Sequence, residues 1–208
     1  MAISCEIIDQ QRLEPAFELV TQVFVQSSTL HQAMAVDLDK YRQYLYPSFL
    51  AMIGERLSIA AMDDQTNEIL GCLIVTELGA PQEIVQGTPE YLKPIAALTA
   101  ELCLRYRQRR PYVGGEVVLV DMGAVSPSAG GKGVYQTLRN VAQETARDRG
   151  FRYVVGELSS AATQHVIINK LGHRKMAEVS FNEFDYEGRR PFQSISEPRS
   201  IILAEFEL

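Results

Sequence analysis

The sequence predicts an α/β protein in which a central mixed β-sheet is flanked by helices. Three observations favour this class. Along the 208 residues, segments with the two-residue period of a strand alternate with segments of helical period. Residues 57–62 and 69–77 are apolar runs joined by a polar turn, which is typical of an antiparallel hairpin. Residues 115–158 have the order strand, glycine-rich turn, helix and strand, and this order implies a parallel pair of strands.

In the first half of the chain we expect helices before and after that hairpin in the sequence. In order, we predict a strand at 3–8, helices at 13–25 and 38–54, the hairpin, and a third helix at 89–109. Pro47 lies inside the second helix and predicts a kink or a break. The third helix ends in the basic sequence RYRQRRP. Cations stabilise the last turn of a helix through its dipole, so this run favours a helix terminus over a phosphate contact.

The second half of the chain is expected to complete the sheet. In order, we predict a strand at 116–125, a helix at 133–149, a strand at 151–158, a short helix at 162–171, and strands at 175–184 and 200–208. No repeat or long linker divides the chain, so we expect one domain over residues 1–208. The last strand is expected at an edge of the sheet, where pairing with a second copy would give a homodimer.

Composition excludes several classes of function. With 46% hydrophobic residues, 22% charged residues and a net charge of −6, the chain is neither a disordered segment nor a general binder of nucleic acid or anionic membranes. The longest apolar run, at 69–75, is much shorter than the roughly 18 residues of a membrane helix. The N-terminus lacks the basic and apolar regions of a signal peptide. We therefore expect a cytoplasmic protein without nucleic-acid or membrane partners.

The cysteines and histidines favour neither a disulfide framework nor a metal site. Three cysteines lie far apart in the sequence, as expected of reduced thiols. Three histidines are equally scattered and show no zinc-binding spacing, so no metal is expected.

The glycine cluster Gly130-Gly131-Lys132-Gly133 is the strongest candidate for a binding site. It is not a P-loop, because Gly133 stands where the Ser or Thr that binds magnesium would follow Lys132. It is not a dinucleotide fingerprint, because Gln136 occupies the place of the last glycine. A strand, a glycine turn and an immediate helix can direct several amide N–H groups at a pyrophosphate. A tight turn without a ligand is the alternative reading of the same residues.

The segment from Val125 to Leu138, VSPSAGGKGVYQTL, resembles the acetyl-CoA signature of the GNAT N-acetyltransferase superfamily. In that family the pattern is Val-x-Pro-x-x-(Arg/Gln)-x-x-Gly-x-(Gly/Ala), followed by a helix. Residues 170–173, KLGH, resemble its closing Lys-Leu-Gly-Phe, and the order of elements matches over essentially the whole chain. The resemblance implies a GNAT fold and acetyl-CoA as cosubstrate. It assigns cofactor contacts to Gly123, Val125, Gly130, Gly131, Lys132, Gly133, Val134 and Tyr135.

Two positions depart from the family pattern. Gly130 replaces the Arg or Gln, and Tyr135 replaces the small residue at the start of the helix. Within the superfamily, the chain is most similar to the arylalkylamine type, through the Ser- and Thr-rich segment before residue 170 and the sequence YEGRRPF at 186–192. The resemblance therefore implies transfer of an acetyl group to a primary amine of the arylalkylamine or polyamine class.

Acetyl transfer requires a group that removes a proton from the amine. Deprotonating an alkylammonium with a pKa near 10 at pH 7 costs roughly 4 kcal/mol. Asp121 is our candidate base, because a carboxylate is unusual in an otherwise apolar strand and a catalytic role would explain it. By the two-residue period it would share a face with Gly123 and Val125. A carboxylate that only faces solvent or pairs with an arginine is the alternative. Glu157, in the next strand, is a reserve.

The resemblance supplies further candidates and two gaps. It places the hydroxyls of Ser159 and Thr163 on the short helix as catalytic groups. Ser28 stands where the arylalkylamine type has a base carboxylate, and Ile168 stands where many members have a tyrosine general acid. His31 is a second reserve near Ser28.

Two alternatives to an acetyltransferase of small amines stay open. The departures from the family pattern favour a catalytically degenerate domain that binds acyl-CoA for regulation. Acetylation of a protein is the other alternative.

Overall fold

The computed structural model describes residues 3–79 and 87–208. Seven strands form one sheet in the order β1-β2-β3-β4-β5-β7-β6. The strands are β1 (Ile3–Ile7), β2 (Ile59–Asp63), β3 (Ile69–Glu77), β4 (Val117–Val125), β5 (Tyr153–Leu158), β6 (Arg174–Ser180) and β7 (Ser200–Glu207). Only β4 and β5 are parallel among these pairs, so the mixed sheet and its parallel unit are confirmed.

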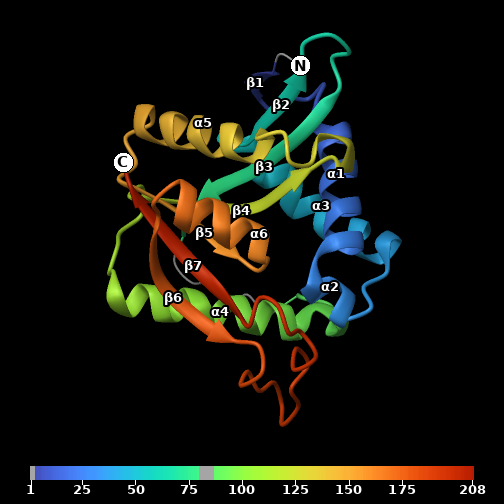
Figure 1. The fold of residues 1–208 in the computed structure, drawn as a ribbon, viewed down its shortest axis with the longest axis vertical. Helices are drawn as coiled ribbons and strands as arrows, with labels where there is room; N and C mark the ends of the chain where they lie inside the picture. Colours follow the sequence, from blue (N-terminus) through green and yellow to red (C-terminus); the bar gives the residue numbers. More distant parts are fainter. Residues whose placement is uncertain (1–2, 80–86) are drawn as a thin grey trace.

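Helices cover both faces of this sheet (Figure 1). They are α1 (Leu13–Ser27), α2 (Thr29–Ala33), α3 (Leu38–Gly54), α4 (Lys93–Arg109), α5 (Val134–Asp148) and α6 (Ala161–Gln164), which continues as a π-helical turn (His165–Lys170). One face packs against α5, whose Leu138 lies in a cluster with Val118 and Val120 of β4. The other face packs against α1, α3 and α4. We call these the α5 face and the α4 face.

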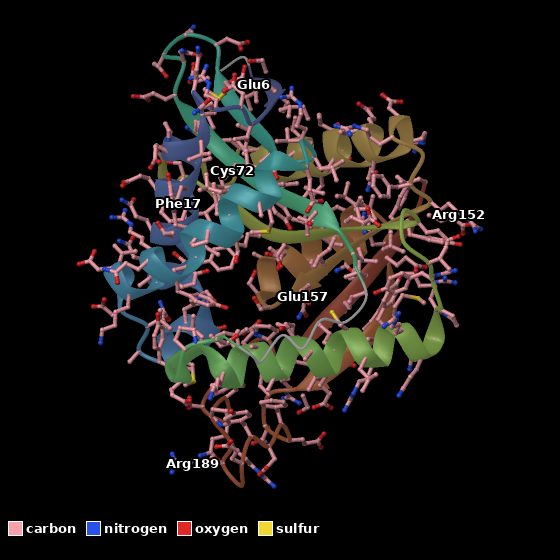
Figure 2. The ribbon with its side chains drawn as sticks, turned by 180° about the vertical axis from the view of Figure 1, so that it is seen from behind. Glu6, Phe17, Cys72, Arg152, Glu157 and Arg189 are labelled. Carbon is pink, nitrogen blue, oxygen red and sulfur yellow. The ribbon has the colours of Figure 1, made fainter. Side chains whose placement is uncertain are left out.

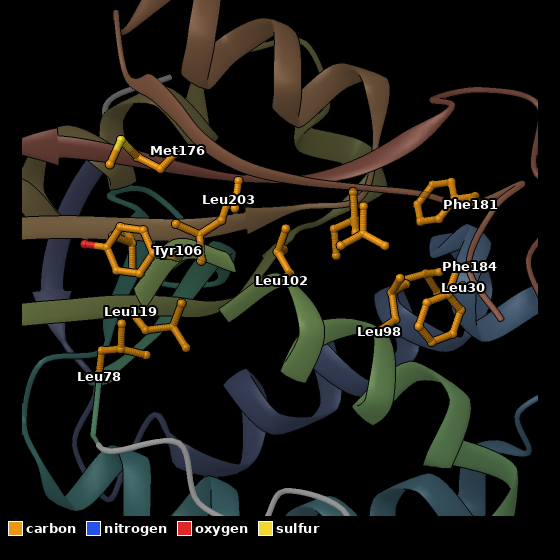
Figure 3. Close-up of a cluster of buried hydrophobic side chains, with 14 of the residues drawn as sticks. Leu30, Leu78, Leu98, Leu102, Tyr106, Leu119, Met176, Phe181, Phe184 and Leu203 are labelled. Atoms are coloured by element: carbon orange, nitrogen blue, oxygen red, sulfur yellow. The ribbon is translucent and has the colours of Figure 1, made fainter. Parts of the chain in front are cut away.

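Helix α4 covers the β5, β7 and β6 end of the sheet. Leu98, Leu102 and Tyr106 recur at helical spacing along its inner side and are fully buried against the strands (Figure 3). The basic end of this helix is tied to β7 through Glu205, a buried carboxylate. Arg110 forms a salt bridge with it, and Tyr106 donates a hydrogen bond to it at 2.8 Å. Arg110 of the basic run therefore has a structural role.

The structure corrects two expectations, the break at Pro47 and the place of the last strand in the sheet. Pro47 does not break α3, because the buried residues on either side of it hold the whole helix to the sheet. The last strand, β7, lies between β5 and β6 and is not an edge strand, so the reason for expecting a homodimer is wrong. No described helix is long and apolar enough to cross a membrane.

Candidate active site

The site begins where the two parallel strands separate. Residues Val117–Val120 of β4 pair with Tyr153–Gly156 of β5. Beyond Val120, β4 pairs only with β3, and beyond Gly156, β5 pairs only with β7. The strands therefore diverge and leave unpaired backbone between residues 121–125 and 157–158. We call this opening the fork.

A β-bulge lies at the apex of the fork. Val75 of β3 pairs with Val120, whereas the preceding residue, Ile74, pairs with Met122. Asp121 is thus an extra residue in β4 without a partner in β3. A bulge of this kind reverses which side chains face each side of the strand.

The bulge corrects the expectation that Asp121 shares a face with Gly123 and Val125. Val125 packs in the α5-face cluster, and a Cβ built on Gly123 would lie 2.9 Å from the ring of Tyr135 on α5. Asp121 instead acts electrostatically on Tyr41 of α3, on the α4 face. The uniform two-residue period assumed from the sequence fails because one residue is inserted.

Asp121 and Glu157 are the first residues beyond the paired part of their strands, and their carboxyl groups interact. Both lie deep in the molecule while keeping part of their surface accessible to solvent; Glu157 lies between α4 and the sheet (Figure 2). Burial raises the pKa of Asp121 to about 6. Burial and the neighbouring Asp121 raise the pKa of Glu157 to about 8. At neutral pH the pair therefore holds about one proton and one negative charge.

Two residues that the sequence did not indicate interact with this pair. The thiol of Cys103, on α4, donates a hydrogen bond to Oε1 of Glu157 at 3.3 Å. Burial raises the pKa of the Tyr41 phenol, and the nearby charge of Asp121 raises it further. Both come from helices far away in the sequence, and neither belongs to a motif. Their place on the apolar face of a helix is the only signal the sequence carries.

Thr163 and His31, which are also predicted site residues, have local structural contacts. Thr163 donates its hydroxyl to the carbonyl of Ser160 at 3.0 Å, and Ser160 caps α6 by accepting the N–H of Thr163. Ser159 lies at the end of β5 and is partly exposed. His31 is buried, 3.0 Å from the hydroxyl of Ser28, and burial lowers its pKa to about 4. At neutral pH it is therefore uncharged.

On the α5 side, backbone amides of β4 point into the fork. Ser126 donates its N–H to the carbonyl of Leu70 in β3 at 2.8 Å. Because N–H groups alternate between the two sides of a strand, those of Val125 and Gly123 point away from β3. They face the side from which β5 has departed and are suited to bind an extended chain or a developing oxyanion.

The glycine loop follows directly and exposes further amides. Gly131 and Gly133 have φ values of +72° and +79°, which disfavour any residue with a Cβ. Among the described residues, neither of their N–H groups donates a backbone hydrogen bond. They lie beside the free N–H groups of the first turn of α5, which Val134 anchors by packing close to Gly71 of β3. Lys132 is exposed in the same loop. This arrangement suits the pyrophosphate of CoA.

Gly130 differs from the two other glycines of this loop. Its φ of −57° is open to any residue, and a Cβ there would lie 3.3 Å from the carbonyl of Pro127. The backbone angles therefore do not require glycine at the position where the family pattern has Arg or Gln, but a side chain there would crowd the carbonyl of Pro127.

A cavity of about 790 Å³ opens between the N-terminus of α4 and the loop between β6 and β7. This loop forms one end of the molecule, where Arg189 lies (Figure 2). Aromatic and acidic side chains are prominent in the walls. The lining residues are Met34, Glu90, Tyr91, Pro94, Tyr186, Glu187, Arg189, Arg190, Pro191 and Gln193. Tyr91 of the cavity wall and Asp121 both act electrostatically on Tyr41.

No group of three or more metal-binding side chains comes together within residues 3–79 and 87–208. The three cysteines are free thiols.

Comparisons with solved structures give similar folds over the full chain. The C-terminal condensation domain of Ebony, in complex with beta-alanyl-dopamine, has a TM-score of 0.88 at 16% identity, with 100% of both chains covered. Arylalkylamine N-acetyltransferase 2 from Aedes aegypti has a TM-score of 0.84 at 20% identity, with 100% of this chain and 99% of that chain covered. Polyamine N-acetyltransferase of Drosophila melanogaster has a TM-score of 0.80 at 13% identity, with both chains fully covered.

No family model and no curated protein matches the sequence. The similarity therefore lies in the fold. The chain has the fold of the GNAT N-acetyltransferases.

Proposed function

We propose that this protein transfers an acetyl group from acetyl-CoA to the primary amine of a small molecule. The observation that carries the proposal is the fork, which has free amides and a glycine loop on one side and two carboxyl groups on the other. Acetyl-CoA supplies the activated acyl group. The N–H groups of Gly131 and Gly133 would hold its phosphates, and those of Gly123 and Val125 would bind along its thioester arm.

The acid pair fits the demands of an amine acceptor. With a pKa near 6, Asp121 is mostly ionised at pH 7, so it can attract an ammonium group and then accept its proton. With a pKa near 8, Glu157 is mostly protonated, which limits repulsion between the two groups. Cys103 positions Glu157 through its hydrogen bond. Asp121 therefore acts as the base of the proposed reaction, and Glu157 sets its charge.

The cavity supports an amine with an apolar or cationic body. Tyr91 and Tyr186 offer ring surfaces to an apolar or cationic body. Glu187 offers a carboxylate beside Arg189 and Arg190, while Glu90 forms a salt bridge with Lys93. Three of the similar structures are described as an arylalkylamine N-acetyltransferase, a polyamine N-acetyltransferase and a domain bound to beta-alanyl-dopamine. These names support an arylalkylamine or polyamine as the acceptor, and we propose that the protein acts in the cytoplasm.

Calorimetry with acetyl-CoA, with free CoA as comparison, tests the donor half of the proposal. Micromolar binding is expected, and the absence of binding at high micromolar concentration would contradict it. A panel of arylalkylamines and polyamines, followed by release of the CoA thiol, then tests turnover. Binding without turnover of any amine would favour the regulatory alternative, and turnover of peptides alone would favour a protein acetyltransferase.

A further inference from the structure

Two side chains of α5 cover the fork on the α5 face of the sheet. The ring of Tyr135 lies against β4, where a Cβ on Gly123 would be 2.9 Å from the ring and 3.7 Å from the hydroxyl oxygen. The guanidinium of Arg139 lies against β5, where a Cβ on Gly156 would be 2.9 Å from Nη1. Each side chain thus occupies the space that a glycine leaves open, Tyr135 beside β4 and Arg139 beside β5. Together they lie over the point where β4 and β5 separate.

Arg139 is a buried cation without an ordinary partner. Its side chain is fully buried, and within the described residues none of its three nitrogens has a hydrogen-bond partner of good geometry. Burial lowers the pKa of Arg139, and its interaction with the phenol of Tyr135 opposes this shift. Buried charges are normally paired, so an unpaired guanidinium here favours a negative charge that forms beside it.

The nearby histidine does not compensate this charge. Burial and Arg139 lower the pKa of His173 to about 3, so its ring is neutral at pH 7. It contacts Gln143 through Nε2 at 2.8 Å, and its ring lies 5.1 Å from the ring of Phe206 at a tilt of 36°. The phenol of Tyr135 is therefore the polar group at the fork that interacts with Arg139.

Resting on the proposed function, we propose that Tyr135 is a catalytic residue that donates its hydroxyl proton to the departing sulfur. Arg139 is then a positioning residue that stabilises the phenolate left behind. The carboxyl groups of Asp121 and Glu157 lie on the other face of the sheet. The residues that pack beside Tyr135 include Leu158, Ile167 and Ile168, which have no proton to give.

The proton and electron balance of this step is complete. The C–N bond forms, the C–S bond breaks, and the bonding electron pair goes to sulfur. The ammonium first passes one proton through Asp121 to solvent, so the neutral amine attacks. Tyr135 then gives its proton to the departing sulfur, while Asp121 takes the second proton from the nitrogen. Proton exchange with solvent then restores both side chains, so no further reactant is required.

Binding measurements test the contact between Tyr135 and sulfur without turnover. We would compare CoA with desulfo-CoA, in which hydrogen replaces the thiol, by calorimetry. The unaltered protein should prefer CoA by about five-fold, as expected for one hydrogen bond. Tyr135→Phe, which keeps the ring against Gly123, should bind the two ligands equally. Equal affinities in the unaltered protein, or an unchanged preference in the variant, would overturn the proposal.

Kinetics test the proton transfer itself. With acetyl-CoA, Tyr135→Phe should lower kcat by about 100-fold, the lower range for a general acid. With the acetyl thioester of 5-thio-2-nitrobenzoate, whose thiolate leaves without a proton, the variant and the unaltered enzyme should react alike. Equal losses with both donors would indicate a structural role for the hydroxyl and overturn the proposal.

Matched variants separate the possible causes. Arg139→Met should lower kcat with acetyl-CoA, and Arg139→Lys should retain more activity than Arg139→Met. Tyr46→Phe, whose hydroxyl donates to Glu14 on the outer surface, should leave kcat unchanged. An unaltered enzyme that acetylates no amine would overturn the proposed function and this inference together. An active enzyme with an equally active Tyr135→Phe variant would overturn the inference alone.

Discussion

Replacing Glu157 by glutamine should stabilise the fold at neutral pH. In the folded protein the pKa of Glu157 rises from its ordinary 4.5 to about 8. The folded state therefore holds a proton that the unfolded state has already released. The stability that this carboxyl contributes is complete below pH 4.5 and is lost as the pH rises from there to about 8. Glutamine cannot ionise, so the variant avoids this loss.

The size of the effect follows from the pKa values. Between 4.5 and pH 7 the loss amounts to about 3 kcal/mol at most, since one pKa unit corresponds to about 1.4 kcal/mol. The amide oxygen of glutamine can still accept the thiol of Cys103, so that contact need not be lost. We therefore expect the free energy of unfolding at pH 7 to rise by up to about 3 kcal/mol in Glu157→Gln.

Urea denaturation at pH 5, 7 and 9 measures the effect. The difference between the variant and the unaltered protein should be small at pH 5, larger at pH 7 and constant above about pH 8. Glu144→Gln, an exposed position on α5, is the control and should change stability by less than about 0.5 kcal/mol. A difference for Glu157→Gln that does not depend on pH would refute the raised pKa of this group.

Three further predictions concern the base, the glycine loop and the buried carboxylate of β7. Asp121→Asn should lower kcat by about 100-fold or more with little change in the Kd of acetyl-CoA; full activity would exclude Asp121 as the base. Gly133→Asp should abolish CoA binding by charge repulsion and backbone strain, whereas Gly133→Ala introduces strain alone and should only weaken binding. Calorimetry distinguishes the two variants, and unchanged affinity in Gly133→Asp would mean that the loop is only a turn. Glu205→Ala leaves the guanidinium of Arg110 without its partner and should lower the free energy of unfolding by about 3–5 kcal/mol. Glu207→Ala, exposed in the same strand, is its control, and similar losses in both variants would contradict a special role for Glu205.

Most of the fold could be predicted because its elements have strong local signals. The helix predicted at 38–54 matches α3, and the strand predicted at 69–77 matches β3. Alternation of apolar residues and a glycine at the helix end are local properties, so a sequence alone reveals them. The place of β7 between β5 and β6 is a long-range property. Nothing in residues 200–208 indicates which strands they pair with, and the edge position was predicted wrongly.

The candidate site was predicted in part, for the same reason. The glycine loop is contiguous and follows a pattern of spacing, so its residues could be named from the sequence. Cys103 and Arg139 could not be identified, because their significance depends on Glu157 and Gly156, residues that are distant in sequence. A buried arginine is also indistinguishable, in a helix sequence, from an exposed one that balances surface charge.

The bulge at Asp121 explains how one strand can serve both sides of the proposed reaction. Without an inserted residue, the carboxylate and Gly123 would lie on the same face, and the base would compete for space with the thioester arm. With it, Asp121 joins Glu157 on the α4 face, while Gly123 accommodates Tyr135 on the α5 face. The amine and the acyl donor can then approach the fork from opposite faces of the sheet. A separation of this kind also keeps the buried guanidinium of Arg139 away from the acid pair, so that each side can hold its own proton.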